Sequence, residues 1–158
     1  MRIYFVVVIF IFLFFSCGNQ RVFEDNIEFA ERAWKISEPA KFDFQITDTL
    51  KKYNLLMDVR NSLEYPYARL FVNYKLTKDS SVLSKEMIAA YLFDQKTGKP
   101  LGSSGLGDLY DHQFFILKNY SFKKPGRYQM KLEQFMRLDT IPGIIAVGLR
   151  VEEAEGKK

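Results

Sequence analysis

The sequence predicts a single antiparallel β-sandwich of about seven to eight strands. Apolar and polar side chains alternate in short segments between residues 41 and 151, which is the period of a half-buried strand. Turn residues separate these segments roughly every ten positions. After the first 16 residues the chain still holds 19 Phe, Tyr and Trp residues, which suit a half-buried pleated surface.

Each predicted strand has one apolar face. The expected strands cover residues 41–47, 55–59, 70–76, 82–93, 113–122, 128–134 and 147–151. Polar turn segments separate most of them, and in Pro125-Gly126 the proline presets the first turn position while the glycine accepts a positive φ. The expected core includes Phe44, Val59, Val72, Leu132 and Leu149.

The N terminus resembles a bacterial export signal. Arg2 precedes an unbroken apolar run, Ile3–Phe15, which is too short for an ordinary membrane span. Ser16 and Cys17 end the run in the pattern of a lipobox, although Phe14 stands where leucine is usual. We expect cleavage before Cys17 and lipidation of Cys17 on its thiol and its amine. A plain membrane anchor and a conventionally cleaved signal are the alternatives.

These features divide the chain into four parts. Residues 1–16 are the lipoprotein signal peptide, and residues 17–37 are a lipidated tether that packs against the domain. In the tether, residues 29–34 could form one helical turn, with Trp34 as a plug. Residues 38–153 form the β-sandwich, and residues 154–158 form a charged tail.

Composition excludes several classes of protein. The chain has 23 basic and 19 acidic side chains, a balance too even to indicate nucleic-acid binding. Cys17 is the only cysteine, so its acylation leaves no thiol for a disulfide, a nucleophile or a metal site. We expect no cofactor, no metal and no small-molecule ligand.

The glycine-rich segment Gly98–Asp108 lacks the context of an enzyme motif. Pro100 follows Gly98-Lys99, whereas a phosphate-binding loop requires Ser or Thr there and a helix after it. Gly102-Ser103-Ser104-Gly105 is one residue too short for a nucleophile elbow. The segment therefore reads as a long connection between two strands, with glycines that permit tight turns.

Isolated titratable residues also have simple structural explanations. His112 is the only histidine, and with Asp108 and Asp111 it is expected to form a polar loop rim rather than a metal site. Four carboxylates could supply a glycosidase pair only if the fold brought two of them within about 5–9 Å. These four are Asp58, Glu64, Asp94 and Glu133.

Ordered short segments resemble a known family. They include Trp34 with Phe42-x-Phe44-x-Ile46, Tyr65-Pro66-Tyr67-x-x-Leu70-Phe71-Val72, Gly105-x-Gly107-Asp108, Glu133-Gln134-x-Met136-Arg137 and Ile141-Pro142-Gly143-Ile144-x-x-Val147-Gly148-Leu149-Arg150. After a lipoprotein signal, this order resembles the gliding-motility lipoprotein GldH family of Bacteroidota. Arg69 departs from the asparagine that members often carry there.

The resemblance implies an envelope lipoprotein without catalytic residues, associated with the gliding-motility and type IX secretion machinery. We expect an anchored, non-catalytic assembly or structural component whose partners are the membrane and other envelope proteins. No acidic cluster follows Cys17, which favours an outer-membrane anchor that faces the periplasm. An envelope glycan-binding module is the alternative.

Two candidate surfaces follow from these hypotheses. Arg137 and Arg150 lie in family-like segments, and both are expected to point away from the inner face, toward a carboxylate of this chain or of a protein partner. A glycan-binding module would instead present two or three coplanar exposed aromatics. The candidates for that platform are Tyr65, Tyr67, Tyr110 and Tyr120.

Overall fold

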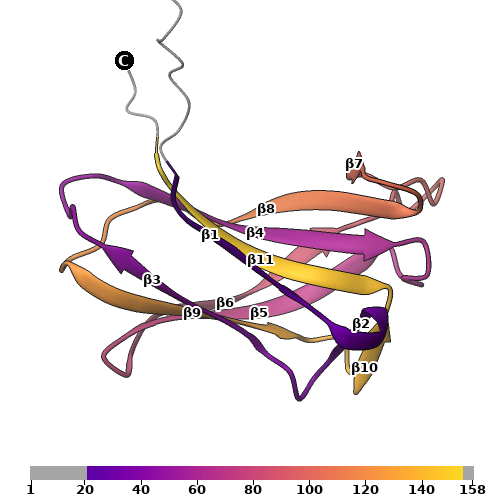
Figure 1. Ribbon diagram of the computed structural model, residues 1–158, viewed down its shortest axis with the longest axis horizontal. Helices are drawn as coiled ribbons and strands as arrows, with labels where there is room; N and C mark the ends of the chain where they lie inside the picture. The colour runs from indigo at the N-terminus through magenta and orange to yellow at the C-terminus, as the bar shows by residue number, and fades with distance from the viewer. Residues whose placement is uncertain (1–20, 155–158) are drawn as a thin grey trace, which may run out of the picture.

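The computed structural model describes residues 21–154 and shows two antiparallel sheets packed face to face (Figure 1). The five-stranded sheet has the order β1 (Arg21–Glu28), β11 (Ile144–Glu153), β4 (Tyr53–Ser62), β8 (Leu109–Tyr120) and β7 (Ser103–Ser104). The four-stranded sheet has the order β3 (Ala40–Ile46), β9 (Gly126–Gln134), β5 (Arg69–Lys78) and β6 (Ser81–Tyr91). A short ribbon pairs β2 (Ala33–Lys35) with β10 (Thr140–Pro142).

The all-β sandwich predicted from the alternation is confirmed. In β3 the burial pattern follows the sequence, with Phe42, Phe44 and Ile46 buried between exposed neighbours. The five side chains expected in the core are all buried, and they belong to one continuous hydrophobic cluster between the two sheets. Among the described residues, no helix is long and apolar enough to cross a membrane.

The expected tether is wrong in its structural part, because the sandwich begins at residue 21 rather than at residue 38. Strand β1 pairs along its whole length with β11. The sequence of β1 shows no alternation of apolar and polar side chains. Only Phe23 and Ile27 are partly buried, and the exposed Asp25 lies between them. Strands β2, β7 and β10 were also missed, since each has only two or three residues.

Trp34 is a core plug, as expected. The predicted helical turn is a 3-10 turn, Ala30–Arg32, after which β2 brings the indole into the core. Trp34 is fully buried and stacks on Phe29 with ring centroids 5.1 Å apart. Its Nε1 donates a hydrogen bond to the Glu38 carbonyl oxygen at 2.9 Å, so burying the ring leaves no unsatisfied donor.

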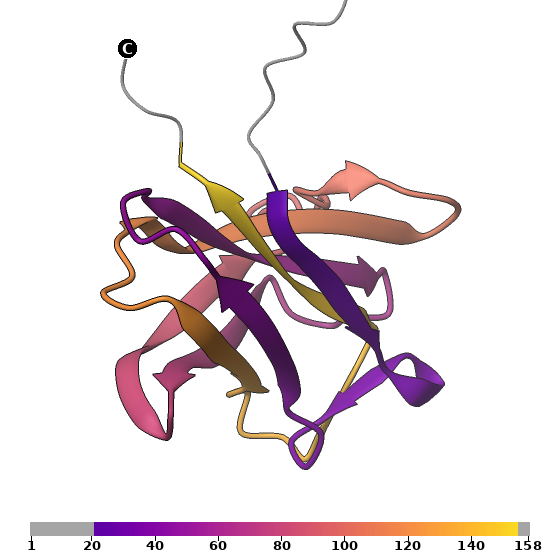
Figure 2. The same ribbon diagram turned by 60° about the vertical axis from the view of Figure 1, so that its left-hand side comes forward.

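The sandwich has two distinct ends. We call the end where β1 starts and β11 finishes the proximal end; it also carries the loops 47–52, 78–81 and 121–125. The distal end carries the β2–β10 ribbon and the loops 63–68, 92–108 and 135–139. Figure 2 shows β1 and β11 side by side, with the start of β1 and the end of β11 at the same end of the sandwich.

Gly143 fixes the tight connection between β10 and β11. Its φ is +77°, and a Cβ placed on it would lie 2.2 Å from the Tyr65 backbone nitrogen. Gly98 has a similar φ of +67° but open space around it.

Alanine substitution at these two glycines distinguishes the cost of a left-handed backbone from the cost of a steric collision. We expect Gly98→Ala to lower the free energy of unfolding by about 1–2 kcal/mol, the cost of a left-handed backbone. Gly143→Ala should cost about 3 kcal/mol or more, because the methyl group also collides with fixed backbone. Equilibrium denaturation measures both values, and equal losses would contradict the proposed collision.

Candidate functional site

The outer face of the five-stranded sheet contains a trough of about 440 Å³. Its floor is β11, where Ala146 and Gly148 present little or no side chain toward solvent. A Cβ on Gly148 would lie 3.0 Å from the Asp25 carbonyl oxygen and 3.4 Å from the Asp58 Cβ, so the glycine sets the depth of the floor. Longer polar side chains from β1, β4 and β8 form the walls.

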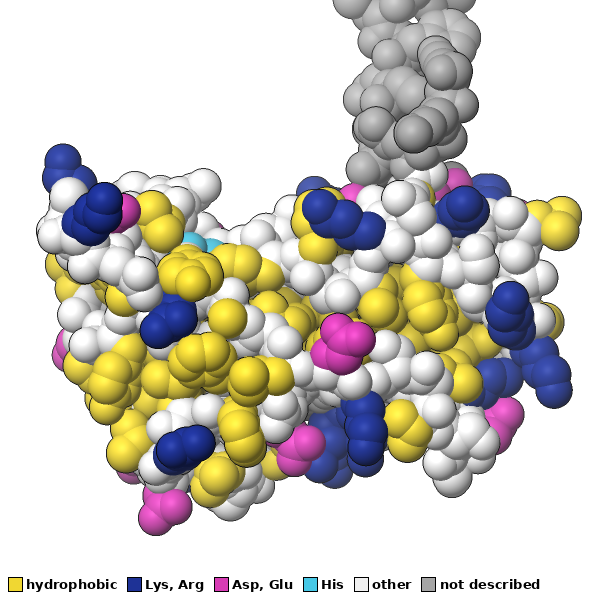
Figure 3. All heavy atoms as spheres, turned by 180° about the vertical axis from the view of Figure 1, so that it is seen from behind, with side chains coloured by type: hydrophobic (Ala, Val, Ile, Leu, Met, Phe, Trp, Pro, Cys, Tyr) yellow, Lys and Arg dark blue, Asp and Glu magenta, His cyan; other side chains and the backbone are white. Residues whose placement is uncertain are grey.

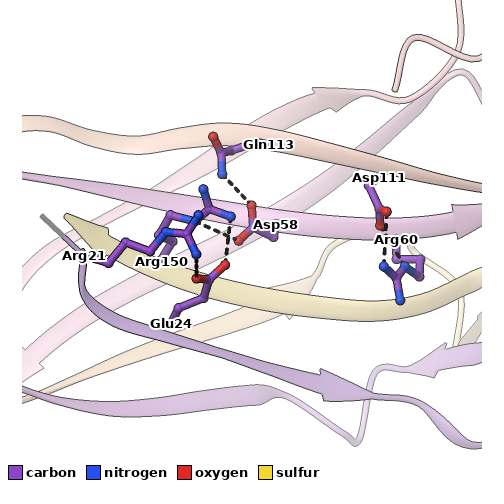
Figure 4. Close-up of polar contacts among 7 residues, drawn as sticks. All are labelled: Arg21, Glu24, Asp58, Arg60, Asp111, Gln113 and Arg150. Atoms are coloured by element: carbon purple, nitrogen blue, oxygen red, sulfur yellow. Dashed lines mark hydrogen bonds and ion pairs between the residues drawn. The ribbon is translucent and has the colours of Figure 1, made fainter. Parts of the chain in front are cut away.

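A charged network fills the proximal part of the trough (Figure 4). The Arg150 guanidinium lies 2.8 Å from Glu24 Oε1 and 3.7 Å from Asp58 Oδ2. Arg21 also pairs with Glu24 at 2.7 Å, and Gln113 Nε2 donates to Asp58 Oδ1 at 2.8 Å. Burial raises the pKa of Asp58, while the hydrogen bond from Gln113 and the charge of Arg150 act in the opposite direction.

A second pair lies further along the same face. Arg60 on β4 contacts Asp111 on β8 through two hydrogen bonds, Nε to Oδ1 at 2.7 Å and Nη2 to Oδ2 at 3.1 Å. These bonds raise the pKa of Arg60 further. A bidentate pair of this kind between neighbouring strands stabilises their register and also neutralises both charges.

Three of the five carboxylates that line the trough pair with arginines. The carboxylates of Glu24, Asp58 and Asp111 each contact an arginine. Within residues 21–154, no group of three His, Cys, Asp or Glu side chains is placed to hold a metal ion. This arrangement can present polar side chains to a partner, and its charges also stabilise the sheet itself.

The four carboxylates considered as a glycosidase pair lie on separate elements. Asp58 faces the trough, Glu64 lies 3.7 Å from Arg32, and Glu133 pairs with Lys131 at 2.7 Å. Asp94 accepts hydrogen bonds from the hydroxyl and the backbone N–H of Thr97 in the turn after β6. These bonds lower the pKa of Asp94. Each therefore has a separate local role.

The expected loop rim around His112 is wrong. His112 lies inside β8, opposite Val59, with 8% of its surface exposed. Its ring stacks on Phe114 and contacts Gly102, and its Nε2 forms no hydrogen bond to another described residue. The sequence concealed this position because β8 starts four residues before the predicted strand. Asp108 pairs instead with Arg32, at 3.1 Å.

The glycine-rich segment is a connection between β6 and β8, as predicted. Its two serines form the short strand β7, which pairs with β8. The left-handed φ of +70° at Gly107 permits the turn into β8.

The four tyrosines do not form one exposed platform. Tyr65 is buried in the core and lies edge-on to Tyr67, with an interplanar angle of 73°. Tyr110 is only partly exposed, and Tyr120 packs edge-on against Phe122. The coplanar surface that a glycan-binding module would present is therefore absent from these four side chains.

The two candidate arginines lie apart. Arg150 lies in the trough with its side chain 22% exposed, and its guanidinium lies 3.7 Å from Asp58 Oδ2. Arg137 lies in the distal loop after β9, is exposed, and has a φ of +59°. In the part of the chain that the structure describes, its guanidinium forms no hydrogen bond or ion pair.

Sequence comparison relates this fold to known proteins. The family model described as "GldH lipoprotein" matches residues 21–151. The chain belongs to the GldH lipoprotein family. A "Gliding motility lipoprotein GldH homolog" from Christiangramia forsetii is 28% identical, over 98% of this chain and 99% of that protein. "Gliding motility lipoprotein GldH" from Flavobacterium johnsoniae is 27% identical, over 90% of this chain and 91% of that protein.

Solved structures resemble this GldH family member only remotely. The CBM35 from Cellvibrio japonicus Abf62 aligns with a TM-score of 0.33 and 9% identity, covering 90% of this chain and 96% of that one. The VP2 subviral particle of infectious bursal disease virus aligns with a TM-score of 0.35 and 12% identity, covering 88% of this chain and 31% of that one.

The buried histidine of this GldH family member predicts a pH dependence of stability. Burial lowers the pKa of His112, against a smaller opposing effect of Asp111. Below about pH 6.5 the unfolded chain takes up a proton that the folded chain resists, so the free energy of unfolding falls as the pH falls.

We expect wild type to lose more stability than His112→Leu between about pH 7 and about pH 5. Carboxylates that titrate in this range are shared by both proteins, so they cancel in the difference between the two denaturation series. Parallel plots of the free energy of unfolding against pH would show that His112 contributes nothing to the pH dependence.

Proposed function

We propose that this protein is a lipid-anchored, non-catalytic envelope component that serves assembly or structure in the gliding-motility and type IX secretion machinery. The observation that carries the proposal is membership of the GldH lipoprotein family over residues 21–151. The name of the Flavobacterium johnsoniae relative supplies the link to gliding motility.

The N-terminal sequence supports attachment through Cys17. This residue follows the apolar run directly and lies four positions before the first described residue, outside the described part of the chain. No acidic residue stands between Cys17 and Arg21, which favours the outer membrane and its periplasmic face.

The side-chain chemistry supports a binding role rather than a catalytic one. The trough carboxylates of Glu24, Asp58 and Asp111 contact arginines. The imidazole of His112 is buried beside Gly102. General acid–base catalysis requires a titratable group within reach of a substrate. The three paired carboxylates instead hold neighbouring strands together through their arginines.

The distal end supplies the features of a protein-binding surface. Arg137 is exposed there, close to the exposed apolar side chains of Phe135 and Leu138. Ile36 joins them, because its backbone N–H donates to the Asp139 carbonyl oxygen at 2.8 Å. Arginine beside apolar side chains is typical of protein interfaces. We therefore place the partner contact at Arg137, with Arg150 as a supporting position within the sheet.

Removing the proposed lipid should release the protein from membranes. We expect Cys17→Ala to move from the membrane fraction to the soluble fraction. Stable attachment requires more than one acyl chain, and alanine at this position can carry none. Fractionation after an alkaline wash measures the change against wild type. Full retention of Cys17→Ala in the membrane would contradict the lipid anchor.

Charge reversal at Arg137 tests the partner surface. We expect Arg137→Glu to change the free energy of unfolding by less than about 0.5 kcal/mol, because the side chain is exposed and unpaired in the described structure. The same variant should abolish co-purification of envelope partners and gliding. Lys85→Glu is the matched control, since Lys85 is exposed in the middle of β6 rather than in a distal loop. If Arg137→Glu leaves the complex intact, the partner surface lies elsewhere.

A further inference from the structure

The proximal end is rich in lysine. Its three loops, residues 47–52, 78–81 and 121–125, carry five lysines and two aspartates. Lys52, Lys123 and Lys124 are exposed, and none of them has an ion pair within residues 21–154. In Figure 3 several dark-blue Lys and Arg side chains lie at the right-hand end of the molecule.

The acidic groups around these loops have partners of their own. Glu153 lies 2.6 Å from Lys51, and Asp79 lies 3.7 Å from Lys78. Asp48 Oδ1 accepts the backbone N–H of Leu50 at 2.9 Å. The end therefore has an excess of positive charge.

A buried aromatic cluster fixes the loops in place. Phe122 is almost fully buried and contacts the rings of Phe44, Tyr53, Tyr120 and Tyr128 at centroid distances of 4.6–6.1 Å. Because the 121–125 loop and the start of β4 pack on the same ring, the exposed lysines project from a rigid support.

The lysines surround a hollow of about 260 Å³ with an aromatic floor. Three lysines and one carboxylate line its rim: Lys78, Asp79, Lys123 and Lys124. Three aromatic side chains line its base: Tyr120, Phe122 and Tyr128. Lys78 Nζ lies 4.8 Å from the centre of the Tyr128 ring and donates to the Pro125 carbonyl oxygen at 3.1 Å. A cationic rim above an apolar floor suits a phosphate group attached to a less polar body.

Leu50 projects from the same end. Its side chain is 96% exposed, although the loop that carries it is closed by Asp48, whose carbonyl oxygen accepts the Tyr53 hydroxyl at 2.6 Å. Lys51 and Lys52 follow it directly. An apolar side chain next to lysines is typical of segments that lie in a membrane interface.

We propose that the proximal end docks on anionic phospholipid headgroups. Lys52, Lys123 and Lys124 contact the phosphates, and Leu50 enters the boundary between headgroups and acyl chains. The inference rests on the proposed acylation of Cys17, which lies four residues before Arg21. Four residues span at most about 14 Å, so the anchor holds this end within reach of the surface field, whose screening length is about 8–10 Å.

A fluorescent probe at Leu50 tests this docking in the mature, acylated protein. Leu50→Cys introduces the only free thiol, which takes an environment-sensitive dye, and Leu106→Cys is the matched control with a 91% exposed leucine at the distal end. In vesicles of phosphatidylglycerol and phosphatidylcholine we expect a blue shift at position 50 and none at position 106. Vesicles of phosphatidylcholine alone should give a smaller shift.

Charge reversal tests the contribution of the lysines to docking separately from that of the acyl anchor. We expect Lys123→Glu with Lys124→Glu to lower the docking equilibrium constant at least about tenfold, because each lysine near an anionic surface contributes favourably. Lys96→Glu with Lys99→Glu makes the same change in an exposed distal loop and should have no effect. Added salt should weaken docking of the wild type.

The outcomes distinguish this inference from the proposed anchor. Mass spectrometry of the purified protein reports first whether Cys17 is acylated. If it is acylated and inserts, but the probe at position 50 behaves like the probe at position 106, the docking surface is wrong while the anchor stands. A shift at position 50 that needs native envelope membranes and is absent from pure lipid would assign this end to a protein partner and overturn lipid docking.

Discussion

Strand β11 joins the N-terminal strand to the rest of the sandwich, because it pairs with β1 on one side and with β4 on the other. Its inward side chains Val147, Leu149 and Val151 are fully buried between the sheets. Its outward positions form the floor of the trough. Without β11, β1 would have no partner in the five-stranded sheet, and the chain would reach the core only at β2.

Charged side chains on the outer face of the five-stranded sheet differ from those at the two ends of the sandwich. On the outer face, Arg150 and Arg60 meet carboxylates from neighbouring strands. Their geometry is set by strand register, so the pairs can form without ordering a loop. At the ends, loops separate Lys123, Lys124 and Arg137 from carboxylates of this chain. These three unpaired cations therefore lie where the chain turns, which is also where another surface can approach most closely.

The sequence predicts what depends on local alternation and misses what depends on distant pairing. Phe42, Phe44 and Ile46 identify β3 because each alternate residue is buried. Strand β1 has no such signal, since its stability comes from β11, more than a hundred residues later. The Glu24–Arg150 contact joins positions 126 residues apart. No spacing rule could have shown that pair.

The candidate residues follow the same rule. Asp58 and Arg60 alternate with Val59 in the sequence, which could have placed both on the outer face of one strand. Their partners could not be predicted, because Gln113 and Asp111 belong to β8, about 50 residues later, and only the register of β8 with β4 brings them opposite. His112 was misplaced for a related reason: only its pairing with Val59 shows that the ring faces inward.

The rigidity of the sandwich connects its two ends. Phe122 and its aromatic neighbours hold the proximal loops to the same core that supports the distal ribbon through Trp34. The two sheets share one continuous hydrophobic cluster. A surface that fixes the proximal loops therefore also fixes the direction in which the distal end points. Contact with a membrane at one end would present Arg137 away from that membrane, so the two proposed surfaces can act at the same time.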